Sequence, residues 1–127
     1  IQSLGREHTT LLTAGETPVM QRLRAAWTAA RSQPALGASL ADILEVVRSA
    51  LAGEPPATES MALQIPADFA GRPLVTAELV RHCHAHDIAV HVWTVNDPPE
   101  IARLLALGVD GIVTDHPGRM AALLGRI

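Results

Sequence analysis

The 127-residue sequence has one cysteine, no tyrosine, one phenylalanine and two tryptophans. With Cys83 as its only cysteine, the chain can form neither an intrachain disulfide nor a CxxC metal knuckle. Such cysteine usage fits a reducing compartment, so we expect a cytoplasmic protein. The sequence also lacks any run of about 18 apolar residues, which argues against a transmembrane segment.

A basic surplus is missing as well. Lysine and arginine together number 10 against 13 aspartates and glutamates, and the formal net charge is −3. Proteins that bind nucleic acids neutralise many phosphates with lysine and arginine, so we expect no nucleic-acid partner. A small phosphate-bearing ligand remains compatible with this charge, because it needs only a few well-placed groups.

Short strand-like apolar runs alternate with segments of helical periodicity. Strands are expected at residues 9–14, 61–65, 88–95 and 109–114, and helices at 17–31, 40–52, 77–86, 98–107 and 117–124. Ser39 and Asp42 form a capping-box variant at the start of the second helix. That helix is expected to bury the apolar residues Leu40, Ile43, Leu44, Val47 and Leu51.

Strands separated by helices favour right-handed crossovers and a parallel sheet with the helices outside. The chain has about four such βα units, and its 127 residues are about half of the roughly 250 in a complete (β/α)₈ TIM barrel. We therefore expect an α/β fold in which residues 1–127 form a single partial domain, half of a barrel. The absence of an initiating methionine suggests an excised or truncated chain. Because open sheet edges are avoided, the alternatives are a missing half, pairing of two copies, or an open α/β sheet.

The strand at residues 88–95 carries the first candidate for a ligand site. Side chains alternate along a strand, so His91 and Trp93 share one face, while the other face is aliphatic and suits contact with helices. Trp93 then points into the barrel near the carboxyl end of its strand, where barrel enzymes build their sites. The alternative is that Trp93 simply fills a core. His91 is either a hydrogen-bonded core histidine or a base.

Asp115 is the second candidate, at the carboxyl end of the strand at residues 109–114. There it is placed to accept a hydrogen bond from a substrate hydroxyl. Alternatively, it caps the final helix. Asp110 lies at the opposite end of the same strand, so we interpret it as structural.

The segments VHVWTVND (residues 90–97) and GVDGIVTDHP (residues 108–117) resemble the last two βα units of the glycerophosphodiester phosphodiesterases. ALQIP and LVTAELVRHCHAH upstream are also similar to members of this family. The resemblance is specific from Ala62 to Pro117 and loose over residues 1–53. It implies the C-terminal half of a TIM barrel. One departure is Asp87, where many relatives have glycine.

The resemblance implies hydrolysis of a glycerophosphodiester to an alcohol and glycerol 3-phosphate. It further implies a divalent cation, calcium or magnesium, held by carboxylates, and two histidines acting as general acid and base. The family's H-R-G and E-N-T motifs are absent here, so the resemblance assigns this chain no catalytic residue and no metal ligand. It does imply a substrate-pocket wall made by Trp93, Asn96 and Asp115.

We therefore expect the isolated chain to hydrolyse little or no substrate. The expected partners are a glycerophosphodiester-type small molecule and either the missing N-terminal half of the barrel or a second copy of the chain. Two alternatives remain: a non-catalytic half-barrel module that self-associates, and part of another phosphate-binding TIM barrel.

The segment HCHAH (residues 82–86) suggests a different hypothesis, a metal site on a helix. Glu78, His82 and His86 recur at four-residue spacing along one helix face, and histidines spaced in this way can bind zinc. The alternative is that these three residues form the solvated face of a helix that buries Leu79 and Cys83 instead.

Overall fold

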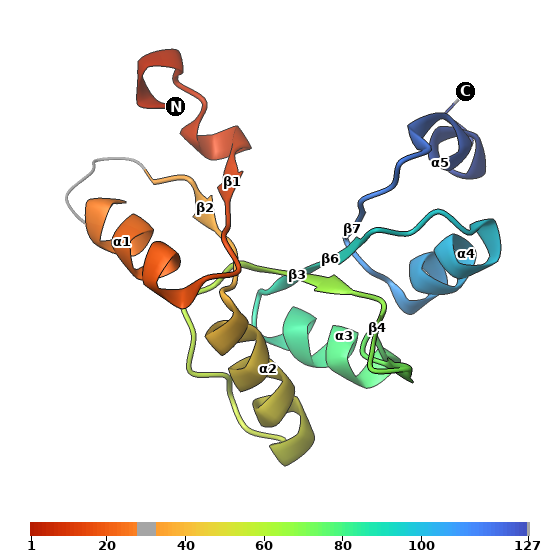
Figure 1. The fold of residues 1–127 in the computed structure, drawn as a ribbon, viewed down its shortest axis with the longest axis horizontal. Coiled ribbons are helices and arrows are strands. Elements are labelled where there is room, and N and C mark those ends of the chain that lie inside the picture. Colours follow the sequence, from red (N-terminus) through yellow and green to blue (C-terminus); the bar gives the residue numbers. More distant parts are fainter. Residues whose placement is uncertain (28–32, 127) are drawn as a thin grey trace. The chain divides into compact units, whose positions relative to one another are not determined.

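The computed structural model describes residues 1–27 and 33–126 (Figure 1). The strands are β1 (Leu11–Leu12), β2 (Ala35–Leu36), β3 (Ala62–Pro66), β4 (Asp68–Phe69), β5 (Arg72–Pro73), β6 (Ala89–Trp93) and β7 (Gly111–Ile112). The helices are α1 (Thr17–Trp27), α2 (Leu40–Ala52), α3 (Ala77–Ala85), α4 (Pro98–Leu107) and α5 (Pro117–Leu123), and two short 3₁₀ helices (Gln2–Leu4 and Glu7–Thr9) precede β1. The end expected for the first helix, at residue 31, lies outside the described residues. No described helix has both the length and the apolar character needed to cross a membrane.

The chain divides into two compact units, Ile1–Leu63 and Gln64–Ile127. In the first unit β1 pairs in parallel with β2, and Gly37 makes a parallel bridge to Ala62. The second sheet has the order β3-β6-β7, and β6 pairs in parallel with β7, with His91 opposite Gly111. The expectation of an α/β fold with parallel strands is therefore confirmed.

Within the described ranges, five strands are each followed by a helix, one more than expected: β1-α1, β2-α2, β3-α3, β6-α4 and β7-α5. The unexpected strand is β2, which has two residues between Pro34 and Gly37 and is too short to show an alternating pattern. The hairpin formed by β4 and β5 was also not expected. Its two turn residues, Ala70 and Gly71, have φ values of 52° and 73°. Positive φ at both central residues is the signature of a type I′ turn, and Ala-Gly is not among its usual sequence signals.

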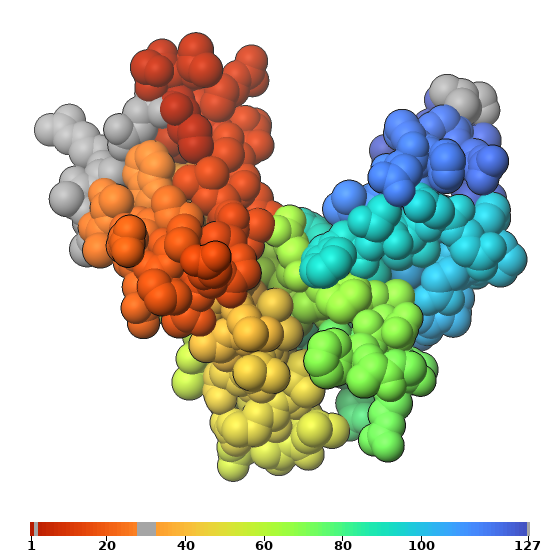
Figure 2. Space-filling view, viewed as in Figure 1, coloured from red at the N-terminus to blue at the C-terminus, as the bar shows by residue number. Residues whose placement is uncertain are grey.

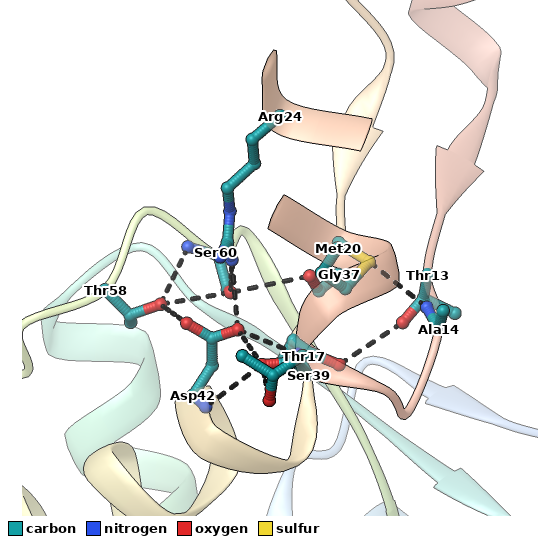
Figure 3. Close-up of polar contacts among 11 residues, drawn as sticks. Thr13, Ala14, Thr17, Met20, Arg24, Gly37, Ser39, Asp42, Thr58 and Ser60 are labelled. Carbon is teal, nitrogen blue, oxygen red and sulfur yellow. Dashed lines mark hydrogen bonds and ion pairs between the residues drawn. The ribbon is translucent and has the colours of Figure 1, made fainter. Parts of the chain in front are cut away.

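A hydrogen-bonded carboxylate links α1, α2 and the segment before β3 (Figure 3). The predicted capping box of Ser39 and Asp42 is present. Arg24 donates from Nη2 to Asp42 Oδ2 and to Ser60 Oγ, both at 3.0 Å, and Thr58 donates to Asp42 Oδ1 at 2.8 Å. Burial alone would raise the pKa of Asp42, but the hydrogen bonds from Ser39, Thr58 and Arg24 outweigh it and lower the pKa to about 2.

The buried face expected for α2 is wrong for three of its five residues, because this network turns another face of the helix inward. Val46 and Ser49 are fully buried and lie four and seven residues after Asp42, on the same face of the helix. The face that carries the hydrogen-bonded carboxylate is therefore turned inward. Three side chains that were expected to be buried are instead exposed: Leu40, Leu44 and Leu51.

In the second unit, β6 separates its two faces as the alternation predicts. Ile88, Val90 and Val92 are buried, and α3 packs against this strand. On the opposite face His91 is half-buried and Trp93 is 46% exposed. The aliphatic face thus meets the helices, and the other face carries the polar and aromatic groups.

Candidate substrate site at the carboxyl ends of β6 and β7

Trp93 is the last residue of β6, at the edge of the sheet where the loops to α4 and α5 begin. Its side chain is 46% exposed, so it does not fill a core within the described part of the chain. The peptide bond that follows it, Trp93–Thr94, is cis. An indole ring held at this edge offers a flat apolar surface to a ligand.

Asn96 and Asp115 are joined by reciprocal hydrogen bonds. Asn96 Nδ2 donates to Asp115 Oδ2 at 2.8 Å, and Asn96 Oδ1 accepts from the Asp115 backbone N–H at 2.9 Å. Asn96 Oδ1 also accepts from Thr114 Oγ1 at 3.0 Å, a contact that the sequence pattern did not reveal. The Asn96 amide therefore fastens the loop after β6 to the loop after β7.

The position of Asp115 excludes one of its two interpretations, the cap of α5. The residue that caps α5 is His116, which makes no side-chain capping bond, so Asp115 is not the cap of that helix. Asp115 is exposed, and its Oδ1 makes no hydrogen bond to any described residue. A carboxylate with one oxygen fixed by Asn96 and the other open can accept a hydrogen bond from a ligand hydroxyl.

His91 lies deeper on the same strand face as Trp93. Its ring is packed across Gly111 of β7, where an added Cβ would lie 2.8 Å from His91 Cδ2. The half-buried ring thus forms part of the packing between β6 and β7.

Asp110 lies at the opposite, amino end of β7 and is structural, as expected. Its Oδ2 accepts from the Val90 backbone N–H at 2.7 Å and lies 2.9 Å from His84 Nε2. Burial would raise the pKa of Asp110, but these hydrogen bonds outweigh it and lower the pKa. A shallow depression of about 280 Å³ lies at this amino end, away from Trp93, and is lined by His84, Asp87, Ile88, Ala89 and Asp110.

The described residues hold no group of three or more histidines, cysteines or carboxylates arranged to bind a metal ion. The donor set needed for the calcium or magnesium that the resemblance implies is thus not formed by this part of the chain.

The strands and helices, with β6 paired in parallel with β7, define an α/β protein built from βα units. Residues 7–119 match the Glycerophosphoryl diester phosphodiesterase family, and the chain belongs to that family. The fold class and the resemblance drawn from WTVND and GVDGIVTDHP are therefore confirmed.

Individual relatives are matched over part of their length. The chain is 43% identical over 54 residues to "Probable glycerophosphodiester phosphodiesterase 2" of Mycobacterium tuberculosis, a stretch that covers 42% of this chain and 20% of that protein. It is 47% identical over 45 residues to a glycerophosphodiester phosphodiesterase of Bacillus altitudinis, a stretch that covers 35% of this chain and 18% of that protein. Its structure is similar to that of a putative glycerophosphoryl diester phosphodiesterase from Silicibacter pomeroyi, with a TM-score of 0.67 and 27% identity, covering 97% of this chain and 40% of that one. The chain thus has the fold of part of a phosphodiesterase barrel.

Proposed function

We propose that this chain supplies the substrate-pocket wall of an enzyme that hydrolyses a glycerophosphodiester to an alcohol and glycerol 3-phosphate. The observation that carries the proposal is the exposed Trp93 at the end of β6, on the same sheet edge as the Asn96–Asp115 pair. These residues lie in a chain that belongs to the glycerophosphoryl diester phosphodiesterase family.

Each residue has a separate role in this proposal. The Trp93 ring contacts the carbon atoms of the glycerol group, and Asp115 Oδ1 accepts a hydrogen bond from a glycerol hydroxyl. Asn96 is a positioning residue, because both ends of its amide are already bonded to the loop after β7. Together the three residues select the glycerol side of the substrate and leave the bond cleavage to other groups.

The acid, the base and the metal ligands come, in this proposal, from the N-terminal half of the barrel. Two observations support this. The H-R-G and E-N-T motifs do not occur among the 127 residues, and the described residues hold no group of three or more histidines, cysteines or carboxylates that could bind a metal ion. The required partner is therefore that half of the barrel, supplied on the same or a separate polypeptide. The isolated chain is expected to show little or no hydrolysis.

Complementation tests this directly. The chain is mixed with the amino-terminal half of a full-length relative, and release of glycerol 3-phosphate from glycerophosphocholine is measured. We expect activity from the mixture and none from either part alone. Trp93→Ala should lower kcat/KM about five- to tenfold, mostly through KM, because an aromatic contact worth about 1 kcal/mol is lost.

Phe69→Ala is the matched control. Phe69 is 72% exposed, and its hairpin lies on the surface, where it is seen in lime green in Figure 2. Because this residue lies outside the proposed wall, its removal should change kcat/KM less than twofold. Equal effects of the two variants would contradict the role of Trp93. An inactive mixture in which the chain alone sediments as a folded dimer would favour the non-catalytic, self-associating module.

We also propose a cytoplasmic location. Its support is the buried thiol of Cys83, which as the only cysteine leaves the chain without an intrachain disulfide. Fractionation of cells that express the native gene tests this proposal, and recovery of the protein outside the cytoplasm would contradict it.

A further inference from the structure

The last turn of α3 brings two imidazole rings together. His82 and His86 are four residues apart, and their ring centroids lie 4.9 Å from each other with the planes at 61°. Both side chains are half-buried. The two rings therefore meet edge to face beside the helix.

We propose that His82 and His86 form an open, two-imidazole binding site for a divalent transition-metal ion such as Zn²⁺, Ni²⁺ or Cu²⁺. Histidines one helical turn apart present their nitrogens to a single ion, and imidazole suits these metals. Mg²⁺ and Ca²⁺ prefer oxygen ligands and are not expected to bind here.

The number of ligands limits the strength of the site. Glu78 lies one turn before His82, yet no group of three or more potential ligands is formed within residues 1–27 and 33–126. Water therefore fills the other coordination positions, and the ion exchanges readily. For the same nitrogen donors, we expect Cu²⁺ to bind more tightly than either Ni²⁺ or Zn²⁺.

The site lies at the end of the sheet opposite the proposed substrate wall. α3 ends at Ala85, the chain turns at Asp87, and β6 begins at Ala89, whereas Trp93 lies at the other end of that strand. A bound ion thus links His82 in the last turn of α3 to His86 at its C-cap. It should stabilise the end of the helix and the turn that leads into β6. The inference does not depend on the proposed hydrolysis.

Titration calorimetry of the untagged chain with NiCl2 and with ZnCl2 tests the proposal. We expect one equivalent of either metal to bind, and His82→Gln or His86→Gln to raise Kd at least tenfold. His84→Gln is the control, because His84 lies in the same helix but contacts Asp110 instead. It should leave Kd within twofold of the wild type, and MgCl2 should give no binding heat.

Electron paramagnetic resonance with one equivalent of Cu²⁺ gives an independent readout. The wild type should show hyperfine coupling to two imidazole nitrogens, and each single variant coupling to one. Circular dichroism without metal establishes that the variants are folded. If His82→Gln unfolds, His86→Gln, which changes the helix C-cap, tests the proposal in its place. Unchanged Kd in both variants, a loss of binding in His84→Gln, or a wild-type signal from one nitrogen would overturn the proposal.

Discussion

The imidazole of His91 occupies the space that a side chain at position 111 would need. His91 and Gly111 are directly paired across β6 and β7, and a Cβ at position 111 would come within 2.8 Å of His91 Cδ2. The glycine is therefore required by the ring opposite it. This contact lies between the two strands whose following loops carry Asn96 and Asp115.

Gly111→Ala should destabilise the chain because either the ring or the strand must move. We expect the free energy of unfolding to fall by about 1–3 kcal/mol, as is typical of overpacking. Urea denaturation measures it. The double variant His91→Ala/Gly111→Ala should recover most of the loss, since the clash is removed. Gly118→Ala, where nothing lies within 4 Å of an added Cβ, is the control, and an equal loss there would contradict the explanation.

Asn96→Ala should loosen the loop that carries Asp115. It removes the hydrogen bonds to Asp115 and Thr114, and solvent replaces them only in part, so we expect a loss of about 1–2 kcal/mol. Hydrogen exchange at the Asp115 amide should become faster. Thr94→Ala changes an exposed residue of the same loop and should have little effect on that amide. Unaltered protection of Asp115 in Asn96→Ala would show that the amide is not what holds the loop.

Asp42 should make stability depend on pH below neutrality. Its folded pKa is about 2 against an ordinary value of 3.8, so its stabilising contribution is complete above pH 4 and is lost as the pH falls toward 2. Asp42→Asn should lower the free energy of unfolding at pH 7 by on the order of 1 kcal/mol, a value reduced by solvent screening. The difference from wild type should shrink between pH 4 and pH 2. Asp68→Asn, on the exposed hairpin, should show no such change, and a constant difference for Asp42→Asn would refute the prediction.

Asp87→Gly should stabilise the chain. Asp87 has a φ of 57°, a left-handed conformation that is disfavoured by a β-carbon and free of cost for glycine. We expect a gain of about 0.5–1 kcal/mol, read from thermal or urea unfolding. The converse change, Gly108→Ala at the left-handed C-cap of α4 (φ 85°), should lose about 1 kcal/mol. A loss of stability in Asp87→Gly would mean that its carboxylate contributes more than the strain costs.

Local sequence signals predicted the features that depend on neighbouring residues. The Ser39–Asp42 capping box forms as expected, and α3 and α4 begin at the expected residues 77 and 98. Thr76 and Asp97 cap these two helices, and each helix start is decided within one helical turn. The strand β2 and the β4–β5 hairpin were missed. Both consist of two-residue strands, which are too short for an alternating pattern and exist only because a partner strand supplies hydrogen bonds.

The exposure of Leu40, Leu44 and Leu51 could not be predicted from the sequence of α2 alone. The face that is turned inward follows Asp42, whose carboxylate binds Arg24 from α1 and Thr58 from a distant loop. Contacts 16 and 18 residues away in the chain leave no local pattern.

The sequence by itself determined the alternation of strands and helices, the aliphatic face of β6 and the family to which WTVND and GVDGIVTDHP belong. Those properties follow from side-chain periodicity and from the order of residues along the chain. Only the tertiary structure decided that Asp115 is held by Asn96 instead of capping α5, and that the two-residue strands of the β4–β5 hairpin pair. These outcomes depend on contacts between segments that come together only when the chain folds. No spacing along the sequence specifies those contacts.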